Sequence, residues 1–175
     1  PNQSNRDVFE IDNVNDRVVL RGSSQPAIGY AMNYYLKHFC HSQVSRAGQH
    51  INLPLELPLP DKKISISSPY VHRYFLNYCT FNYSMSFWDW EDWERELDIM
   101  AIQGVNLALA INGTEAVWQR TLKQHGFSNE EIARFIPGPG YQAWWLMGNL
   151  EGWGGPVDQV WIESRWDDKT ISVRI

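Results

Sequence analysis

The sequence predicts an α/β fold: a small N-terminal α/β domain, followed by the first strands and helices of a (β/α)8 barrel of the TIM type. An apolar segment, a capped helix and a second apolar segment follow one another from Tyr74 to Ala110, about the length of a strand–helix–strand unit. All nine tryptophans lie between Trp88 and Trp166, so composition also divides the chain. We expect a first domain over residues 1–60 and the first part of a barrel over residues 61–175.

The expected N-terminal domain begins with a hairpin. Phe9–Asp12 and Arg17–Arg21 have strand composition, with a turn of Asp and Asn residues between them. Apolar residues at helical spacing then predict a helix over Ala27–Phe39, for which Ser24 is a suitable N-cap. Three prolines in Leu53–Lys63 predict an extended linker that ends the domain, which we expect to be incomplete.

The alternating segment Ile64–Ser67 predicts a short strand that leads towards the second region. Tyr74–Cys79 and Val105–Ala110 predict two parallel strands, each buried on both faces. Between them, Asp89 can cap a helix, and Gly104 stands where that helix should end. Its expected core-facing stripe is formed by four residues, namely Trp93, Leu97, Met100 and Ala101.

The remaining chain predicts short helices around a long loop. A helix is expected over Thr114–Gln124, and Ser128 with Glu131 forms a capping box for the next one. The Gly- and Trp-rich segment 138–156 predicts a functional loop with a helical turn near Trp144. From Trp161 onward the pattern fits either a helix or a strand.

Composition argues weakly against two classes of partner, nucleic acid and anionic membranes. The net charge is −5, and no basic stripe is present to meet nucleic acid or an anionic membrane. No apolar run approaches the roughly 20 residues of a membrane span. We expect Cys40 and Cys79 to be free buried thiols, and no metal or other cofactor, because the His38–His41 cluster lacks the accompanying ligands of a zinc site.

Polar residues follow both predicted parallel strands, where barrel enzymes carry their chemistry. Together with nearby tryptophans they suit a sugar, which needs flat aromatic surfaces and polar groups that fix its hydroxyls. The tryptophans available as flat surfaces are Trp88, Trp90, Trp144, Trp145 and Trp153. Any single tryptophan is more often a core residue. The carboxylates of Asp89–Asp98 are explained by their place at a helix start. Glu115 fits either an early helix position or a site. The candidates that follow the two strands are Asn77, Cys79, Thr80, Tyr83, Asn112, Gly113, Thr114 and Glu115, and Trp144 of the later loop is added as a flat surface.

Three stretches resemble glycoside hydrolase family 89, the α-N-acetylglucosaminidases. They are RYFLNYCTFNYSMSFWDWEDWERELDIMAIQGVNLALA, GTEAVWQR and FIPGPGYQAWWLMGNLEGWGGP, which together cover most of residues 70–156. The segments YLKHFCH and SRAG are similar to the family's N-terminal domain. The resemblance implies removal of terminal α-linked N-acetylglucosamine with retention, by two glutamates and without a metal. It also implies a secreted, periplasmic or lysosomal setting. Matching motif positions imply a substrate pocket with Asn77, Cys79, Tyr83, Trp144 and, on weaker grounds, Glu115.

The family's catalytic glutamates lie well downstream of the MGNL motif, so we expect them beyond Ile175. On this interpretation the chain is a fragment of a glycosidase that needs the rest of its parent chain to complete the barrel. We expect the fragment alone to fold poorly and to be inactive. The alternative is a non-catalytic carbohydrate-binding or interaction module derived from the same fold.

Overall fold

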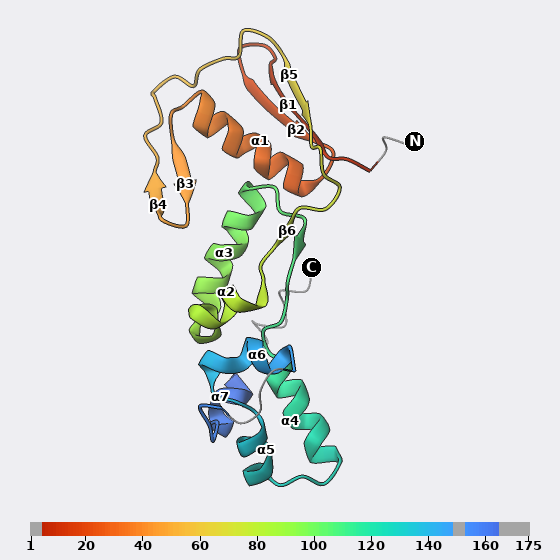
Figure 1. Cartoon of the computed structure of the whole chain (residues 1–175). Helices are drawn as coiled ribbons and strands as arrows, with labels where there is room; N and C mark the ends of the chain where they lie inside the picture. Colours follow the sequence, from red (N-terminus) through yellow and green to blue (C-terminus); the bar gives the residue numbers. More distant parts are fainter. Residues whose placement is uncertain (1–4, 149–152, 165–175) are drawn as a thin grey trace. The chain divides into compact units, whose positions relative to one another are not determined.

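A computed structural model of the chain describes residues 5–148 and 153–164 and contains both helices and strands (Figure 1). The chain divides into two compact units. The first consists of Pro1–Phe75 with Glu94–Ala108, and the second of Leu76–Trp93 with Leu109–Ile175. Each unit is therefore built from two separate stretches of chain.

The first unit contains an antiparallel sheet of three strands in the order β2-β1-β5. Strands β1 (Val8–Asn13) and β2 (Val18–Gly22) form the expected hairpin. Strand β5 (Ile64–Ser67) pairs with the other edge of β1, so that Ile64 lies opposite Ile11. The predicted strand at Ile64–Ser67 is therefore confirmed, and its pairing with β1 makes it part of the first sheet.

Helix α1 (Gln25–His38) covers this sheet (Figure 1). As predicted, the Ser24 side chain caps it by accepting a hydrogen bond from the Ala27 amide. Ala31 and Tyr35 on its inner face pack with Phe9 and Ile11 of β1 in one buried apolar cluster. The apolar residues that recur at helical spacing form one face of α1, and the alternating apolar residues of β1 form the sheet face on which it packs.

Tyr35 also fixes the proline-rich segment. Its hydroxyl donates a 2.8 Å hydrogen bond to the Pro58 carbonyl. Burial, together with a hydrogen bond and the charge of Cys40, raises the pKa of Tyr35 to about 12. As predicted, the segment Leu53–Lys63 is not helical; it follows the short hairpin of β3 (Gln43–Ser45) and β4 (Gly48–His50).

Strands β6 (Tyr74–Phe75) and β7 (Leu107–Ala108) pair in parallel, which confirms the predicted parallel arrangement. Both strands are shorter than expected. After β6 the chain enters a helix at Tyr78, and Val105 and Ala110 lie outside β7. They are also not buried on both faces: Tyr74 is 54% exposed and Leu107 46%. In the part of the chain that the structure describes, this pair is not continued into a closed barrel.

Helix α3 (Trp90–Ile102) runs between these strands in the sequence. Asp89 accepts a hydrogen bond from the Asp92 amide, and Gly104, at φ +75°, ends the helix as predicted. The expected stripe is only partly correct. Met100 is buried, but Ala101 is exposed, and Glu96 is buried at 3% exposure. The Glu96 carboxylate is paired with Arg46, whose guanidinium also lies 4.0 Å from the centre of the Phe75 ring.

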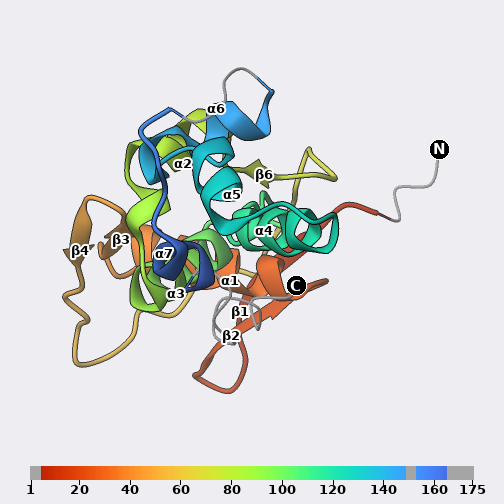
Figure 2. The ribbon, with the colours of Figure 1, turned by 90° about the horizontal axis from the view of Figure 1, so that it is seen from below.

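The second unit is helical. Its core is formed by six buried residues, which come from four helices, the residue that caps the end of the second of them and the segment that precedes the last: Ala116, Ile132, Ile136, Trp145, Val157 and Ile162. Helices α4 (Thr114–Gln124) and α5 (Asn129–Phe135) lie next to each other in Figure 2, and α5 has the predicted capping box. Helices α6 (Gln142–Leu146) and α7 (Gln159–Ser164) complete the core; the positions after 164 in the ambiguous C-terminal pattern lie outside the described residues.

An ion pair between Arg73 and Asp7 connects distant parts of the first unit. Arg73 also donates hydrogen bonds to the main-chain carbonyls of Gly104 and Tyr70. Burial raises the pKa of the Asp7 carboxyl, but hydrogen bonds from Ser24, Arg73 and Ser23 and the positive charge of Arg73 lower it. The net pKa lies below the usual value of 3.8.

We expect Asp7→Asn to lower the free energy of unfolding by about 1–3 kcal/mol at neutral pH, since it leaves Arg73 without its counter-charge. Because the folded-state pKa of Asp7 is depressed, the stabilisation is present above about pH 3.8 and is lost as pH falls through the folded-state pKa. Thermal unfolding midpoints of the protein and the variant should therefore converge in acid. A difference that stays constant with pH would contradict this role.

We also expect Gly29→Ala to be destabilising. In a helix interior, replacing glycine by alanine normally stabilises the helix by about 1 kcal/mol. At Gly29 in α1, however, an added Cβ would lie 2.5 Å from the Ala101 carbonyl oxygen at the end of α3. Overpacking of this kind costs about 1–3 kcal/mol.

Gly140→Ala is the matched control, because an added Cβ there meets nothing within 4 Å. Its unfolding midpoint should stay unchanged or rise slightly. Equal behaviour of the two variants in thermal unfolding would show that α1 and α3 do not pack closely at Gly29.

Candidate functional site

The candidate residues lie in the second unit, and the first of them, Asn77, begins helix α2 (Tyr78–Tyr83). Leu76, which precedes it, is buried and has φ +154°, a value that residues with a side chain rarely adopt. The Asn77 side-chain oxygen accepts hydrogen bonds of 2.8 Å from the Thr80 amide and 2.9 Å from the Thr80 hydroxyl. The oxygen thus caps the helix, whereas the NH2 group makes no hydrogen bond among the groups that the structure describes.

Cys79 lies in the first turn of α2 and is exposed, so the expectation of two buried thiols is wrong for this residue. The other cysteine, Cys40, is buried and free, as expected. An exposed thiol at a helix start can contact a ligand without rearrangement of the core.

Tyr83 at the end of α2 contacts Trp144 of α6. The two ring centres are 6.4 Å apart and the ring planes stand at 88°, an edge-to-face contact. Tyr83 is 77% exposed and Trp144 half-buried, so both keep aromatic surface open to a ligand. The structure therefore brings together two predicted site residues that are 61 positions apart in the sequence.

Two further rings extend this contact. Tyr141, in the short 3-10 helix η2 (Pro139–Tyr141), lies 6.4 Å from Trp144 and 6.1 Å from Trp153. We call the four residues Tyr83, Trp144, Tyr141 and Trp153 the aromatic array. Trp153 was among the tryptophans available as flat surfaces in the sequence, whereas Tyr141 was missed.

Two glycines, Gly138 and Gly154, allow the backbone at Trp153 to lie next to Tyr141. The Gly138 amide donates a 2.8 Å hydrogen bond to the Trp153 carbonyl. A Cβ on Gly138 would lie 2.3 Å from the Gly154 carbonyl oxygen, and one on Gly154 would lie 2.6 Å from the Tyr141 ring. Only glycine allows these backbones to approach.

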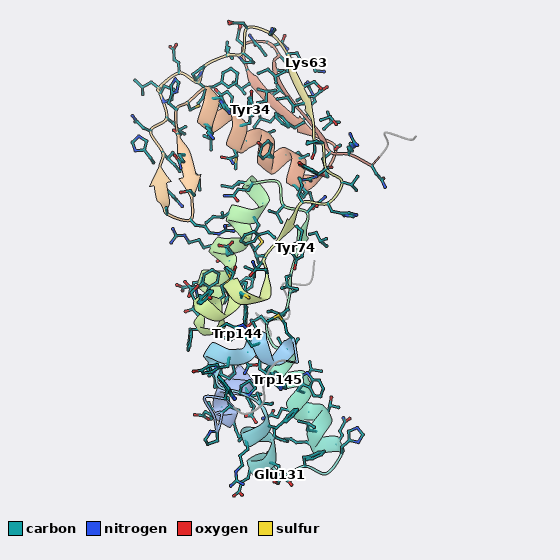
Figure 3. All side chains as sticks on the ribbon, viewed as in Figure 1. Tyr34, Lys63, Tyr74, Glu131, Trp144 and Trp145 are labelled. Atoms are coloured by element: carbon teal, nitrogen blue, oxygen red, sulfur yellow. The ribbon has the colours of Figure 1, made fainter. Side chains whose placement is uncertain are left out.

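The two tryptophans of α6 have different surroundings (Figure 3). Trp145 is buried in the core, where it contacts Trp118 and Phe135 edge to face at 5.6 and 5.7 Å. Trp144 belongs to the array. Gln142, at the start of the helix, is 1% exposed and donates to the Pro137 carbonyl, which fixes the turn that precedes the array.

Glu115 lies in the first turn of α4, after Gly113 at φ +85°. Its side chain is buried, with 2% of its surface exposed. It is thus an early helix residue in its local structure, and its role towards substrate stays a prediction. Neither the N-cap role of Asn77 nor the burial of Glu115 was predicted.

The residues that the structure describes contain no group of three or more His, Cys, Asp or Glu side chains placed to hold a metal ion. No described helix is long and apolar enough to cross a membrane.

Two family models match the chain. The model of the "Alpha-N-acetylglucosaminidase (NAGLU) tim-barrel domain" matches residues 73–173, and that of the N-terminal domain of the same enzyme matches residues 1–59. The human α-N-acetylglucosaminidase is 43% identical over 145 residues, which is 83% of this chain and 20% of the human protein.

Solved structures of a family 89 glycoside hydrolase from Clostridium perfringens are similar as well. One is in complex with 2-acetamido-1,2-dideoxynojirmycin. Another carries two glutamate-to-glutamine substitutions and is in complex with its substrate, GlcNAc-alpha-1,4-galactose. In both comparisons the TM-score is 0.85 at 42% identity, over 91% of this chain and 18% of the other. The chain thus spans about a fifth of the length of these relatives.

A barrel-domain model that matches more than half of the chain, together with 43% identity to a relative, shows the family: the chain belongs to the α-N-acetylglucosaminidases of glycoside hydrolase family 89.

Proposed function

We propose that this chain forms part of the substrate pocket of a retaining glycosidase that removes terminal α-linked N-acetylglucosamine. The observation that carries the proposal is the contact between Tyr83 and Trp144, which leaves two aromatic surfaces open in one place. The apolar face of a hexose can pack on such surfaces. The N-acetylglucosamine-containing ligand of the Clostridium perfringens relative supports the class of sugar.

Polar groups near the array complete the proposed pocket. The NH2 group of Asn77 can donate to a ligand oxygen, because only the side-chain oxygen is used by the helix cap. Cys79 lies two residues further on, exposed in the same helix. We keep Glu115 as a weaker candidate, since its carboxylate would have to reach a ligand from a buried position.

We propose that the two catalytic glutamates are supplied by the complete protein outside residues 1–175. The form of the relative with two glutamates replaced by glutamine, bound to intact substrate, supports a glutamate pair. In a retaining mechanism one carboxylate attacks the anomeric carbon while the other protonates the leaving oxygen, and the second then activates water. The residues of this chain would bind and orient the sugar for that pair.

We further propose that residues 1–60 and 61–175 are parts of two domains of the complete protein. The separate family models for an N-terminal and a barrel domain support a division of this kind. The remaining strands would pair with β6 and β7 and cover the faces on which Tyr74 and Leu107 are exposed.

We expect Tyr83→Ala and Trp144→Ala each to raise KM for an aryl α-N-acetylglucosaminide by about tenfold, with a smaller effect on kcat. Each substitution removes an aromatic contact worth about 0.5–1.5 kcal/mol plus buried area. Steady-state hydrolysis by the complete protein that contains this chain measures both constants.

Phe127→Ala is the control, because Phe127 is a half-exposed aromatic in the same unit that has no ring contact in the described residues. Its KM should be unchanged. If KM is unchanged in all three variants while the protein hydrolyses the substrate, the array is not the sugar site. If sugar binds but no hydrolysis occurs even in the complete protein, the alternative of a non-catalytic binding module is correct.

We expect residues 1–175 expressed alone to show no hydrolysis of the same substrate, because the proposed catalytic pair is absent from them. The assay is the release of the aryl group, with the complete protein as the positive control. Turnover by the isolated chain that is lost in Glu115→Gln would place a catalytic carboxylate within it and refute this part of the proposal.

A further inference from the structure

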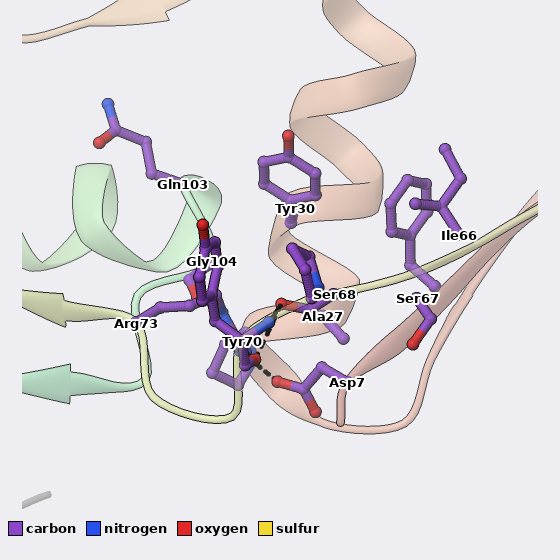
Figure 4. Close-up of a pocket in the computed structure, with 13 residues that line it drawn as sticks. Asp7, Ala27, Tyr30, Ile66, Ser67, Ser68, Tyr70, Arg73, Gln103 and Gly104 are labelled. Atoms are coloured by element: carbon purple, nitrogen blue, oxygen red, sulfur yellow. Dashed lines mark hydrogen bonds and ion pairs between the residues drawn. The ribbon is translucent and has the colours of Figure 1, made fainter. Parts of the chain in front are cut away.

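The first unit contains a cavity of about 320 Å³ that none of the site residues lines (Figure 4). It lies between the start of α1, the end of β5 and the loop that leads to Arg73, with the α3 terminus at Gln103 and Gly104 on a further side. Its volume is at the small end of the range for ligand pockets, so it suits a single ring rather than a chain.

Aromatic side chains form two walls of the cavity. Tyr30 of α1 is held edge to face against Phe9, with 5.6 Å between ring centres, and its Cβ lies against Gly104, where an added methyl would be 3.2 Å away. Tyr70 lies in a loop fixed by Ser68, whose hydroxyl donates to the Tyr70 carbonyl and accepts from the Tyr70 amide. With Pro26 and Pro69 also in the lining, the cavity is formed before a ligand binds.

The lining of the cavity carries no net charge. Arg73 and Asp7 are the charged residues that line it, and they are paired with each other (Figure 4). Four neutral polar groups of the lining, however, have no hydrogen-bond partner among the described residues: the hydroxyls of Tyr30, Ser67 and Tyr70 and the side-chain amide of Gln103. A ligand with a flat apolar face and neutral hydroxyls matches this combination, whereas an anion has no free positive charge to meet.

We propose that this cavity is a second saccharide-binding site that takes one neutral sugar ring, separate from the aromatic array of the second unit. The Tyr30 and Tyr70 rings contact the apolar face of the sugar, and their hydroxyls and Gln103 bind its hydroxyl rim. The proposal does not depend on the catalytic function, because the site holds a sugar whether or not the protein cleaves one.

The test uses the complete protein with its catalytic pocket saturated with 2-acetamido-1,2-dideoxynojirmycin. The disaccharide GlcNAc-alpha-1,4-galactose is then titrated and its binding followed by saturation-transfer NMR. We expect binding to persist under saturation and to weaken about tenfold in Tyr70→Ala, as the loss of an aromatic contact of about 1.4 kcal/mol would produce. Tyr70 is 67% exposed and its hydroxyl makes no hydrogen bond in the described residues, so the variant should keep the fold.

Leu55→Ala is the control: Leu55 is fully exposed in the same unit and does not line the cavity. The affinity of this variant for the disaccharide should be unchanged. Three results would overturn the proposal: no binding under saturation, equal weakening in both variants, or tighter binding of N-acetylglucosamine 6-sulfate than of the neutral disaccharide. A failure of the catalytic proposal is seen separately, as hydrolysis that is insensitive to Tyr83→Ala.

Discussion

The guanidinium of Arg73 holds together segments of the first unit that are far apart in the sequence. It pairs with Asp7 just before β1 and donates to the carbonyls of Tyr70 and Gly104. Its side chain is 19% exposed, so water cannot replace these partners fully. Lysine could not take its place, since only the planar guanidinium offers donors in several fixed directions.

The same residue sets the register of the parallel strands. Two hydrogen bonds join the main chain of Arg73 to Asn106: its amide donates to the Asn106 side-chain oxygen at 2.8 Å, and its carbonyl accepts from the Asn106 amide at 3.2 Å. The Asn106 side chain also donates to the Val71 carbonyl. A parallel pair of only two residues per strand has few hydrogen bonds of its own. Its register therefore depends on contacts just outside the strands, and one of the residues that make them, Arg73, also lines the cavity.

Local interactions were the part of the fold that could be predicted from sequence. Each of these interactions joins residues only a few positions apart: the caps at Ser24 and Ser128 and the helix end at Gly104. Both partners of each interaction therefore lie within one short sequence motif. Long-range partners could not be predicted in this way. Glu96 is buried because Arg46, 50 residues away, pairs with it, and Ile64–Ser67 joins the first sheet because β1 offers a free edge.

The candidate site shows the same division. Tyr83 and Trp144 were found through motifs, whereas their contact needed the fold, and Tyr141 was missed because only the approach of Gly138 and Gly154 places it beside them. The position of Trp144 follows in turn from that of its neighbour. Trp145 is fixed in the core between Trp118 and Phe135. In a helix of five residues, successive side chains point about 100° apart, so a fixed Trp145 leaves Trp144 little freedom of direction. The geometry of the array is thus determined by a packed apolar core that a sugar does not touch.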